Sequence, residues 1–407
     1  MAKDLEPEPA LGWNGVFKSD SYSPRPFGLV DLQDRFASWH DVGAFFKELR
    51  TGVPPLLSFM ELSEYVLTRK LVVTTSWLTR VSIIAAFLIT TFLFCRSQGI
   101  VIFKILISCI FIFAFAVIDR IGPSYDIFWP LCTLLYFVFQ ELGLRTDRLA
   151  GRFWFLFMSG LFLSWSELTR PFMIYLLPLF VVSTALRLWW AGQWAGGREF
   201  LVFLLPIVAF SGLWHAKLFI FERGQISWSN HSGCELALGW RGASRELQFK
   251  EWMDFQRHEM NLPKVYEACQ RRSAKVIRYM FSHPWDSSKW ILRKWVGFHR
   301  VKITWEGVRA EDVKCDVCLN TYKWTAQLLL VFFLYQTARL MVFCFKEQSV
   351  AILASPENML ILTVAASGLV FALVNPLEQA RYQLSLAPFL ATLPVARRAP
   401  SQGPRIT

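Results

Sequence analysis

Charged residues are scarce in this chain of 407 residues. They make up 18% of the sequence, whereas a soluble domain usually carries about 25%. Hydrophobic residues reach 54% and aromatic residues 16%, which is more apolar surface than a soluble core can bury beneath so few charges. The composition therefore excludes an ordinary soluble domain and indicates a polytopic membrane protein. A mean hydropathy of only +0.34 also predicts a sizeable water-facing portion.

Several binding signatures are missing as well. The chain has no phosphate-cradling P-loop and no GxGxxG after a predicted strand, so we do not expect it to use a free nucleotide. It has a single CxxC, formed by Cys315 and Cys318, and a zinc site would need a second one. Cys234 and Cys269 lie in the same polar segment. These four cysteines can form disulfides or remain free thiols, and no metal site is predicted.

Apolar runs make up most of the remaining sequence. A helix needs about 20 apolar residues to span a bilayer, and lipid offers no partner for free backbone groups, so the spans must be helical. The runs are Leu71–Cys95, Gly99–Ile118, Ile127–Gly143, Phe153–Trp165, Phe172–Trp190, Phe200–Phe221, Trp324–Phe345, Asn358–Val374 and Tyr382–Val395. We predict an all-α membrane protein, a polytopic helical bundle of about nine transmembrane helices with a mainly helical extracytoplasmic domain.

The runs divide the chain into five parts. These are an outer-loop-like segment at 1–70, a first transmembrane bundle at 71–221, an extracytoplasmic domain at 222–323, further transmembrane helices at 324–397 and a basic cytoplasmic tail at 398–407. Within the extracytoplasmic domain, helical periodicity is predicted over 247–259 and 264–280. The string HPWDSSKWILRKWVGF predicts a helix that docks on the membrane, with Pro284 near its start.

The net charge of +12 is typical of a membrane protein with basic cytoplasmic loops rather than of a nucleic-acid binder, because the basic residues lie between apolar runs. The loop Glu141–Arg152, the loop containing Arg198 and the tail with Arg397 and Arg398 are predicted to be cytoplasmic. Because successive spans cross the membrane in alternate directions, the far, extracytoplasmic side of the membrane then holds 119–126, 166–171, 222–323 and 375–381.

The same alternation places residues 1–70 on the far side. Their start, MAKDLEPEPALGWNG, lacks the apolar core of a signal peptide. We therefore expect that a first helix is missing before this segment. The alternative is that 54–67 re-enters the membrane and 1–50 remains inside.

The far side gathers the residues that can carry chemistry, since a charged group beside a membrane is costly and is a site hypothesis by default. Carboxylates can act as bases, and guanidinium groups can bind phosphate bidentately. The candidate residues are Asp31, Asp34, Asp126, Glu167, Arg170, His231, Glu378, Arg381 and Tyr382. This combination suits transfer of a group from a lipid phosphate whose tail lies in the bilayer.

Each candidate also has a structural interpretation. Glu167 and Arg170 can pair with each other and end a helix. Arg381 and Tyr382 suit anchoring at the headgroup level, and Asp126 can cap the following helix. Solvated loop positions would equally explain Asp31 and Asp34, and a hydrogen-bonded structural role would explain His231.

Five strings along the chain carry a family resemblance. They are FFKELRTGVPPLLSFM, SELTRPFMIYLLP, SNHSGCELALGW, FSHPWDSSKWILRKW and EQARYQLSLAP. In this order the chain resembles the polytopic glycosyltransferases of the GT-C type. The resemblance implies an inverting transfer of sugar from a polyprenyl-phosphate donor to a lipid, glycan or protein acceptor, in a bacterial inner membrane. It implies Asp31 and Asp34 as catalytic residues, the other candidates as donor or substrate ligands, and Mg or Mn as a possible metal.

A non-enzymatic transporter or scaffold for lipid-linked saccharides is the alternative function. It predicts paired charges along a full path across the membrane. The predicted spans hold Arg80, Lys104, His215, Lys217 and Arg339 but little acid. The enzyme is therefore favoured.

Overall fold

The computed structural model describes the main helical parts of the chain. These are residues 128–170, 172–192, 197–221, 263–298, 316–374 and 394–398, with isolated positions at 85, 88, 89, 236, 240, 386, 388–390 and 392.

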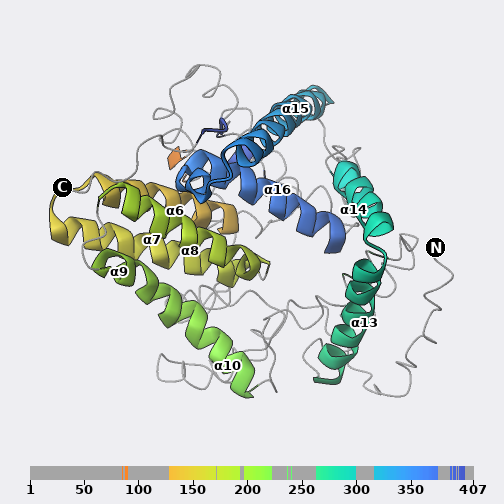
Figure 1. The fold of residues 1–407 in the computed structure, drawn as a ribbon, viewed down its shortest axis with the longest axis horizontal. Coiled ribbons are helices and arrows are strands. Elements are labelled where there is room, and N and C mark those ends of the chain that lie inside the picture. The colour runs from red at the N-terminus through yellow and green to blue at the C-terminus, as the bar shows by residue number, and fades with distance from the viewer. Residues whose placement is uncertain are drawn as a thin grey trace.

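Every element in these ranges is a helix, and they contain no strand. The elements are α6 (Phe128–Arg145), α7 (Leu149–Thr169), α8 (Met173–Trp190), α9 (Arg198–Pro206), the π-helical η4 (Ile207–Gly212), α10 (Leu213–Phe221), α13 (Pro263–Ser282), α14 (Pro284–Phe298), α15 (Asp316–Glu347), the 3-10 helix η6 (Val350–Ala354) and α16 (Pro356–Val374). Figure 1 shows their arrangement. The predicted all-helical fold is confirmed for this part of the chain.

Three helices are long and apolar enough to cross a membrane. They cover Met173–Trp190, Arg198–Ile220 and Gln327–Glu347. A shorter apolar helix covers Pro356–Phe371. The predicted spans at Leu71–Cys95, Gly99–Ile118 and Tyr382–Val395 lie wholly or largely outside the described residues, so the number of nine and the extracytoplasmic domain stay predictions.

Helix α7 is longer than the apolar run Phe153–Trp165 that predicted it. The helix continues through Thr169 because its polar residues find partners inside the protein. Ser166 donates to the carbonyl oxygen of Trp129 at 3.0 Å, and the Ser164 hydroxyl lies 2.8 Å from that of Ser211. Thr169 donates to backbone carbonyls of its own helix. Satisfied hydroxyl groups allow the helix to continue past its last apolar turn.

Helices α6, α7, α8 and α9 form one packed bundle (Figure 1). Its centre consists of fully buried aromatic side chains, including Tyr136, Phe137, Phe180 and Phe203. Tyr136 meets Phe180 edge to face, with ring centroids 5.2 Å apart and an interplanar angle of 89°, which is a favourable geometry for aromatic pairs. Large aromatic groups therefore fill the space between the helices.

A glycine sets the distance between α7 and α9. A Cβ atom added to Gly160 would overlap the carbonyl oxygen of Phe203, and it would lie 2.8 Å from Cγ of Pro206 and 3.1 Å from the Phe203 carbonyl carbon. The two backbones thus approach as closely as a residue without a side chain permits.

The predicted helices at 264–280 and after Pro284 are confirmed as α13 and α14. Helix α15 begins at Asp316, upstream of the predicted domain boundary at 323, so that boundary lies inside a continuous helix. Helix α14 packs against α16 (Figure 1), and its Trp295 contacts the core of the bundle. The predicted helix at 247–259 lies outside the described residues.

Candidate functional site

Two of the nine predicted site residues, Glu167 and Arg170, fall within the described part of the chain. The other seven lie outside it and stay predictions: Asp31, Asp34, Asp126, His231, Glu378, Arg381 and Tyr382. Convergence of all nine on one cavity is therefore also a prediction. Glu167 and Arg170 therefore define the candidate site.

Glu167 pairs with a histidine from another helix. Its side chain is 1% exposed, and its Oε1 lies 2.9 Å from Nε2 of His215 on α10. The His215 side chain is 19% exposed, so the pair has a buried end and a more accessible end. The imidazole holds the carboxylate in one orientation, and a carboxylate beside an imidazole can share or transfer a proton.

The second carboxylate oxygen of Glu167 can accept a further hydrogen bond. Oε2 is buried and has no hydrogen-bond partner within the structure as described. Burying a carboxylate oxygen without a partner is costly, so such groups in native proteins call for an explanation. A ligand hydroxyl or an ordered water at Oε2 would supply one.

The π-helical segment η4 brings His215 to face α7. Phe203, Ile207, Ser211 and His215 follow one another at intervals of four, and four residues of an ideal α-helix overshoot a full turn by about 40°. Over the three intervals the drift would reach about 120°, which would turn His215 away from α7. A π-turn adds one residue and takes back about 100° of this rotation. The Ser211–Ser164 and His215–Glu167 contacts are its result.

Pro206 stands directly before η4. Proline lacks the N–H group that an α-helix would use at this position, so the regular hydrogen-bond pattern is already interrupted there. Side chains often shift register at such interruptions, and π-bulges occur often at functional sites.

Arg170 ends α7. Its backbone N–H donates to the carbonyl oxygens of Ser166 and Glu167, at 3.2 and 3.1 Å, and its own backbone is extended. This confirms that the residue ends a helix, as one of its two interpretations predicted. Besides Arg170, Lys217 carries a positive charge. It lies on α10, the helix of His215, with its Nζ atom 4.7 Å from the centroid of the Trp214 ring.

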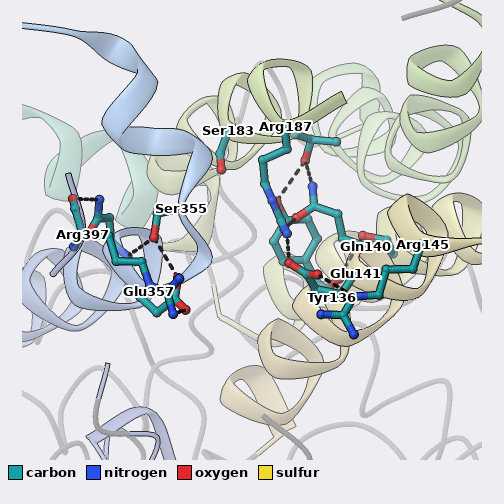
Figure 2. A network of polar contacts seen from close by, with 12 residues as sticks. Tyr136, Gln140, Glu141, Arg145, Ser183, Arg187, Ser355, Glu357 and Arg397 are labelled. Atoms are coloured by element: carbon teal, nitrogen blue, oxygen red, sulfur yellow. Dashed lines mark hydrogen bonds and ion pairs between the residues drawn. The ribbon is translucent and has the colours of Figure 1, made fainter. Parts of the chain in front are cut away.

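A different charged cluster lies at the other end of the bundle (Figure 2). Arg187 of α8 donates to the side chains of Gln140 and Glu141 on α6, and all three are buried. Gln140 also donates to Thr184 at 2.8 Å. Every charge at this cluster has a protein partner, which is typical of a structural ion pair rather than of a ligand site.

The η6 segment contacts α8, which carries Arg187, and the start of α16 contacts Arg397. Ser183 donates to the carbonyl oxygen of Leu353 in η6 at 2.6 Å. Asn358 accepts from the backbone N–H of Arg397 and donates to its carbonyl oxygen, at 2.8 and 2.9 Å. Figure 2 shows the Arg397–Glu357 pair and the Arg187 cluster as two separate groups.

His215 was noted in the sequence only as a polar residue within an apolar run. Its place in an apolar run could have singled it out as a candidate site residue, because an ionisable residue in a membrane helix is a site hypothesis by default. Its pairing with Glu167 was not predictable, since the partners are 48 positions apart and a regular helix would have turned His215 elsewhere.

No protein-family model, curated protein or solved structure matches this chain. Among the described residues, no three His, Cys, Asp or Glu side chains gather as a metal site would require. Glu167 provides a carboxylate, which is a ligand type that Mg and Mn use, whereas imidazole groups such as that of His215 suit other transition metals. One carboxylate is fewer ligands than an Mg or Mn ion needs.

Proposed function

We propose that this chain is a membrane glycosyltransferase. It would move a sugar from a polyprenyl-phosphate donor to a lipid, glycan or protein acceptor at the extracytoplasmic face of a bacterial inner membrane. The observation that carries the proposal is the buried Glu167 carboxylate, which is oriented by His215 and lies one turn before Arg170 at the end of α7.

These residues divide the recognition of the donor between them. Arg170 would hold the donor phosphate, because a guanidinium group binds phosphate bidentately. Oε2 of Glu167 would accept a hydrogen bond from a sugar hydroxyl, and His215 would keep the carboxylate in position. A carboxylate is a poor ligand for phosphate itself, so Glu167 is assigned to the sugar.

The transfer step needs a base, for which Asp31 and Asp34 stay the candidates. The base takes the proton of the acceptor hydroxyl, and the acceptor oxygen forms a bond to the anomeric carbon. The bond between that carbon and the phosphate oxygen breaks, and the polyprenyl phosphate leaves with the electron pair. Attack from the opposite face inverts the anomeric configuration.

The distribution of charge favours an enzyme over a transporter. In α6 to α10, Glu141 with Arg187 and Arg152 with Glu199 mark one end of the bundle, and the Glu167–His215 pair marks the other. Arg152 and Glu167 are separated along α7 by about 22 Å. The space between them is filled by the aromatic side chains and Leu163 of the core. A path of paired charges across the membrane, as a transporter would need, is not what these helices provide.

The test compares two buried carboxylates of the same bundle. Glu167→Gln keeps the shape of the side chain but removes its charge, and Glu199→Gln does the same at the opposite end, where Glu199 is 3% exposed. Purified full-length protein in lipid nanodiscs is supplied with polyprenyl-phosphate sugars, and transfer to added acceptors is measured. We expect Glu167→Gln to lower turnover by about 10²-fold or more and Glu199→Gln to retain it.

Equal turnover in the two variants would contradict the assignment of Glu167 to the active site. A wild-type protein that transfers none of the common polyprenyl-linked hexoses and pentoses would reject the proposed reaction. Thermal melting of both variants is measured alongside, so that loss of folding is distinguished from loss of chemistry.

A further inference from the structure

Helices α13 and α14 expose large apolar side chains that no described segment covers. Phe281 is 82% exposed and Trp285 71%, and Ile277, Leu292 and Val296 are also exposed. At about 100° per residue, the three exposed apolar side chains of α14 lie within about 40° of one another. Those of α13 lie within a similarly narrow strip. Soluble surfaces rarely keep contiguous apolar groups of this size open to water.

A basic strip runs beside each apolar strip. On α13 it consists of Arg271, Lys275 and Arg278, and on α14 of Lys289 and Arg293, all exposed. In both helices these residues occupy roughly the next 100° of the helix surface, on one side of the apolar groups. This arrangement is typical of helices that lie in a membrane interface with their apolar side down.

The charge of the two helices is large for their length. Residues 263–298 contain eight Lys or Arg and two acidic residues, so they carry half of the net charge of +12 of the whole chain. The Nζ atom of Lys289 lies 5.0 Å from the centroid of the Trp285 ring, which keeps the ammonium group above an apolar body, as snorkelling side chains do. Such a surface is complementary to anionic headgroups.

The other faces of α14 are already occupied. Trp290 packs against Trp240 with ring centroids 4.2 Å apart, and Trp295 contacts the core of the transmembrane bundle. Helix α14 packs against α16 (Figure 1). The exposed strip of α14 is therefore held in a fixed orientation, directed away from the Trp290 contact, next to the apolar helix α16.

We propose that α13 and α14 lie in the bilayer interface and bind anionic phospholipid headgroups, with Phe281 and Trp285 inserted among the acyl chains and Lys289 and Arg293 on the phosphates. This surface does not depend on the reaction proposed above. It would anchor the water-facing part of the protein against the bundle at a fixed depth.

The experiment is photo-crosslinking of the full-length protein in nanodiscs. A benzophenone amino acid replaces Trp285, and the discs contain phosphatidylcholine alone or with phosphatidylglycerol. The matched control places the same group at Trp290, which faces the protein. Mass spectrometry then identifies what each probe has labelled. We expect the probe at 285 to label lipid, with phosphatidylglycerol enriched about fivefold or more over its share, as one Lys or Arg near the surface would produce. The probe at 290 should label protein.

A second variant tests the basic strip. Lys289→Gln with Arg293→Gln should leave lipid labelling at 285 in place and reduce the enrichment of phosphatidylglycerol to its share in the disc. Labelling at 285 of the chain itself, or of a second copy, would overturn the proposal in favour of a protein contact. Lipid labelling without any preference for phosphatidylglycerol in the wild type would overturn the binding of anionic headgroups.

Discussion

Replacing Gly160 by alanine tests the packing that supports the Glu167–His215 pair. The added Cβ atom would meet backbone atoms of Phe203, which no rotamer change can move away, and it would lie 3.1 Å from the carbonyl carbon. Carbon atoms pack comfortably at about 3.5–4.0 Å. Helices α7 and α9 must therefore separate by at least about 0.4–0.9 Å. Because α9 continues through η4 into α10, this displacement also acts on the helix that carries His215.

Two effects of opposite sign set the size of the change. Alanine favours a helix over glycine by about 1 kcal/mol, and overpacking a close interface costs about 1–3 kcal/mol. Because the clash is with backbone, the upper part of the second range applies to Gly160. The net loss is then about 2 kcal/mol, which corresponds to a fall in melting temperature of about 4–8 °C for a melting unit of about 150–250 residues and to a smaller fall for a larger unit.

The assay is thermal melting in detergent, followed as the monodisperse fraction that survives heating. Gly212→Ala is the matched control, because a Cβ atom there would find its nearest neighbour at 3.8 Å, an ordinary contact. We expect this variant to melt at or above the wild-type temperature. A Gly160→Ala protein as stable as its control would show that α7 and α9 do not approach as closely as described, and the account of the His215 register would lose its basis.

Two further predictions concern the charged groups. Arg187→Met removes the buried cation that pairs with Glu141 and should lower the free energy of unfolding by about 3–5 kcal/mol. Adding Glu141→Gln should recover most of that loss. A double variant no more stable than the single one in the same melting assay would contradict this. On α14, burial lowers the pKa of Lys294 from 10.5. Because the unfolded chain therefore holds this proton more tightly, stability should rise with pH between the lowered pKa and 10.5. Lys294→Met should flatten that rise. An unchanged slope of melting temperature against pH in this variant would contradict the prediction.

The sequence predicted the helices well where apolar periodicity or a proline start marked them. Helices α8, α13 and α14 lie close to their predicted ranges, because hydrophobicity and proline act through local geometry. The ends of α7 and α15 were not predictable in the same way. In the polar last turn of α7, Ser166 donates to the carbonyl oxygen of Trp129 on another helix, and Thr169 donates to carbonyl oxygens of its own helix.

The site was predicted in part. Glu167 and Arg170 were singled out because charges beside a membrane span are costly, and that argument needs no structure. The partner of Glu167 was missed, since a histidine in an apolar run does not reveal which helix it faces. The other seven candidate residues stay predictions.

Composition alone determined that this protein is helical and suited to a membrane, because so few charges cannot cover so much apolar surface in water. Only the tertiary structure decided which polar groups meet. Gly160 sets the approach of two helices, and the π-turn after Pro206 rotates His215 onto Glu167. Both effects depend on the rotation and separation of whole helices, which are set by packing between distant segments rather than by the residues that form each helix.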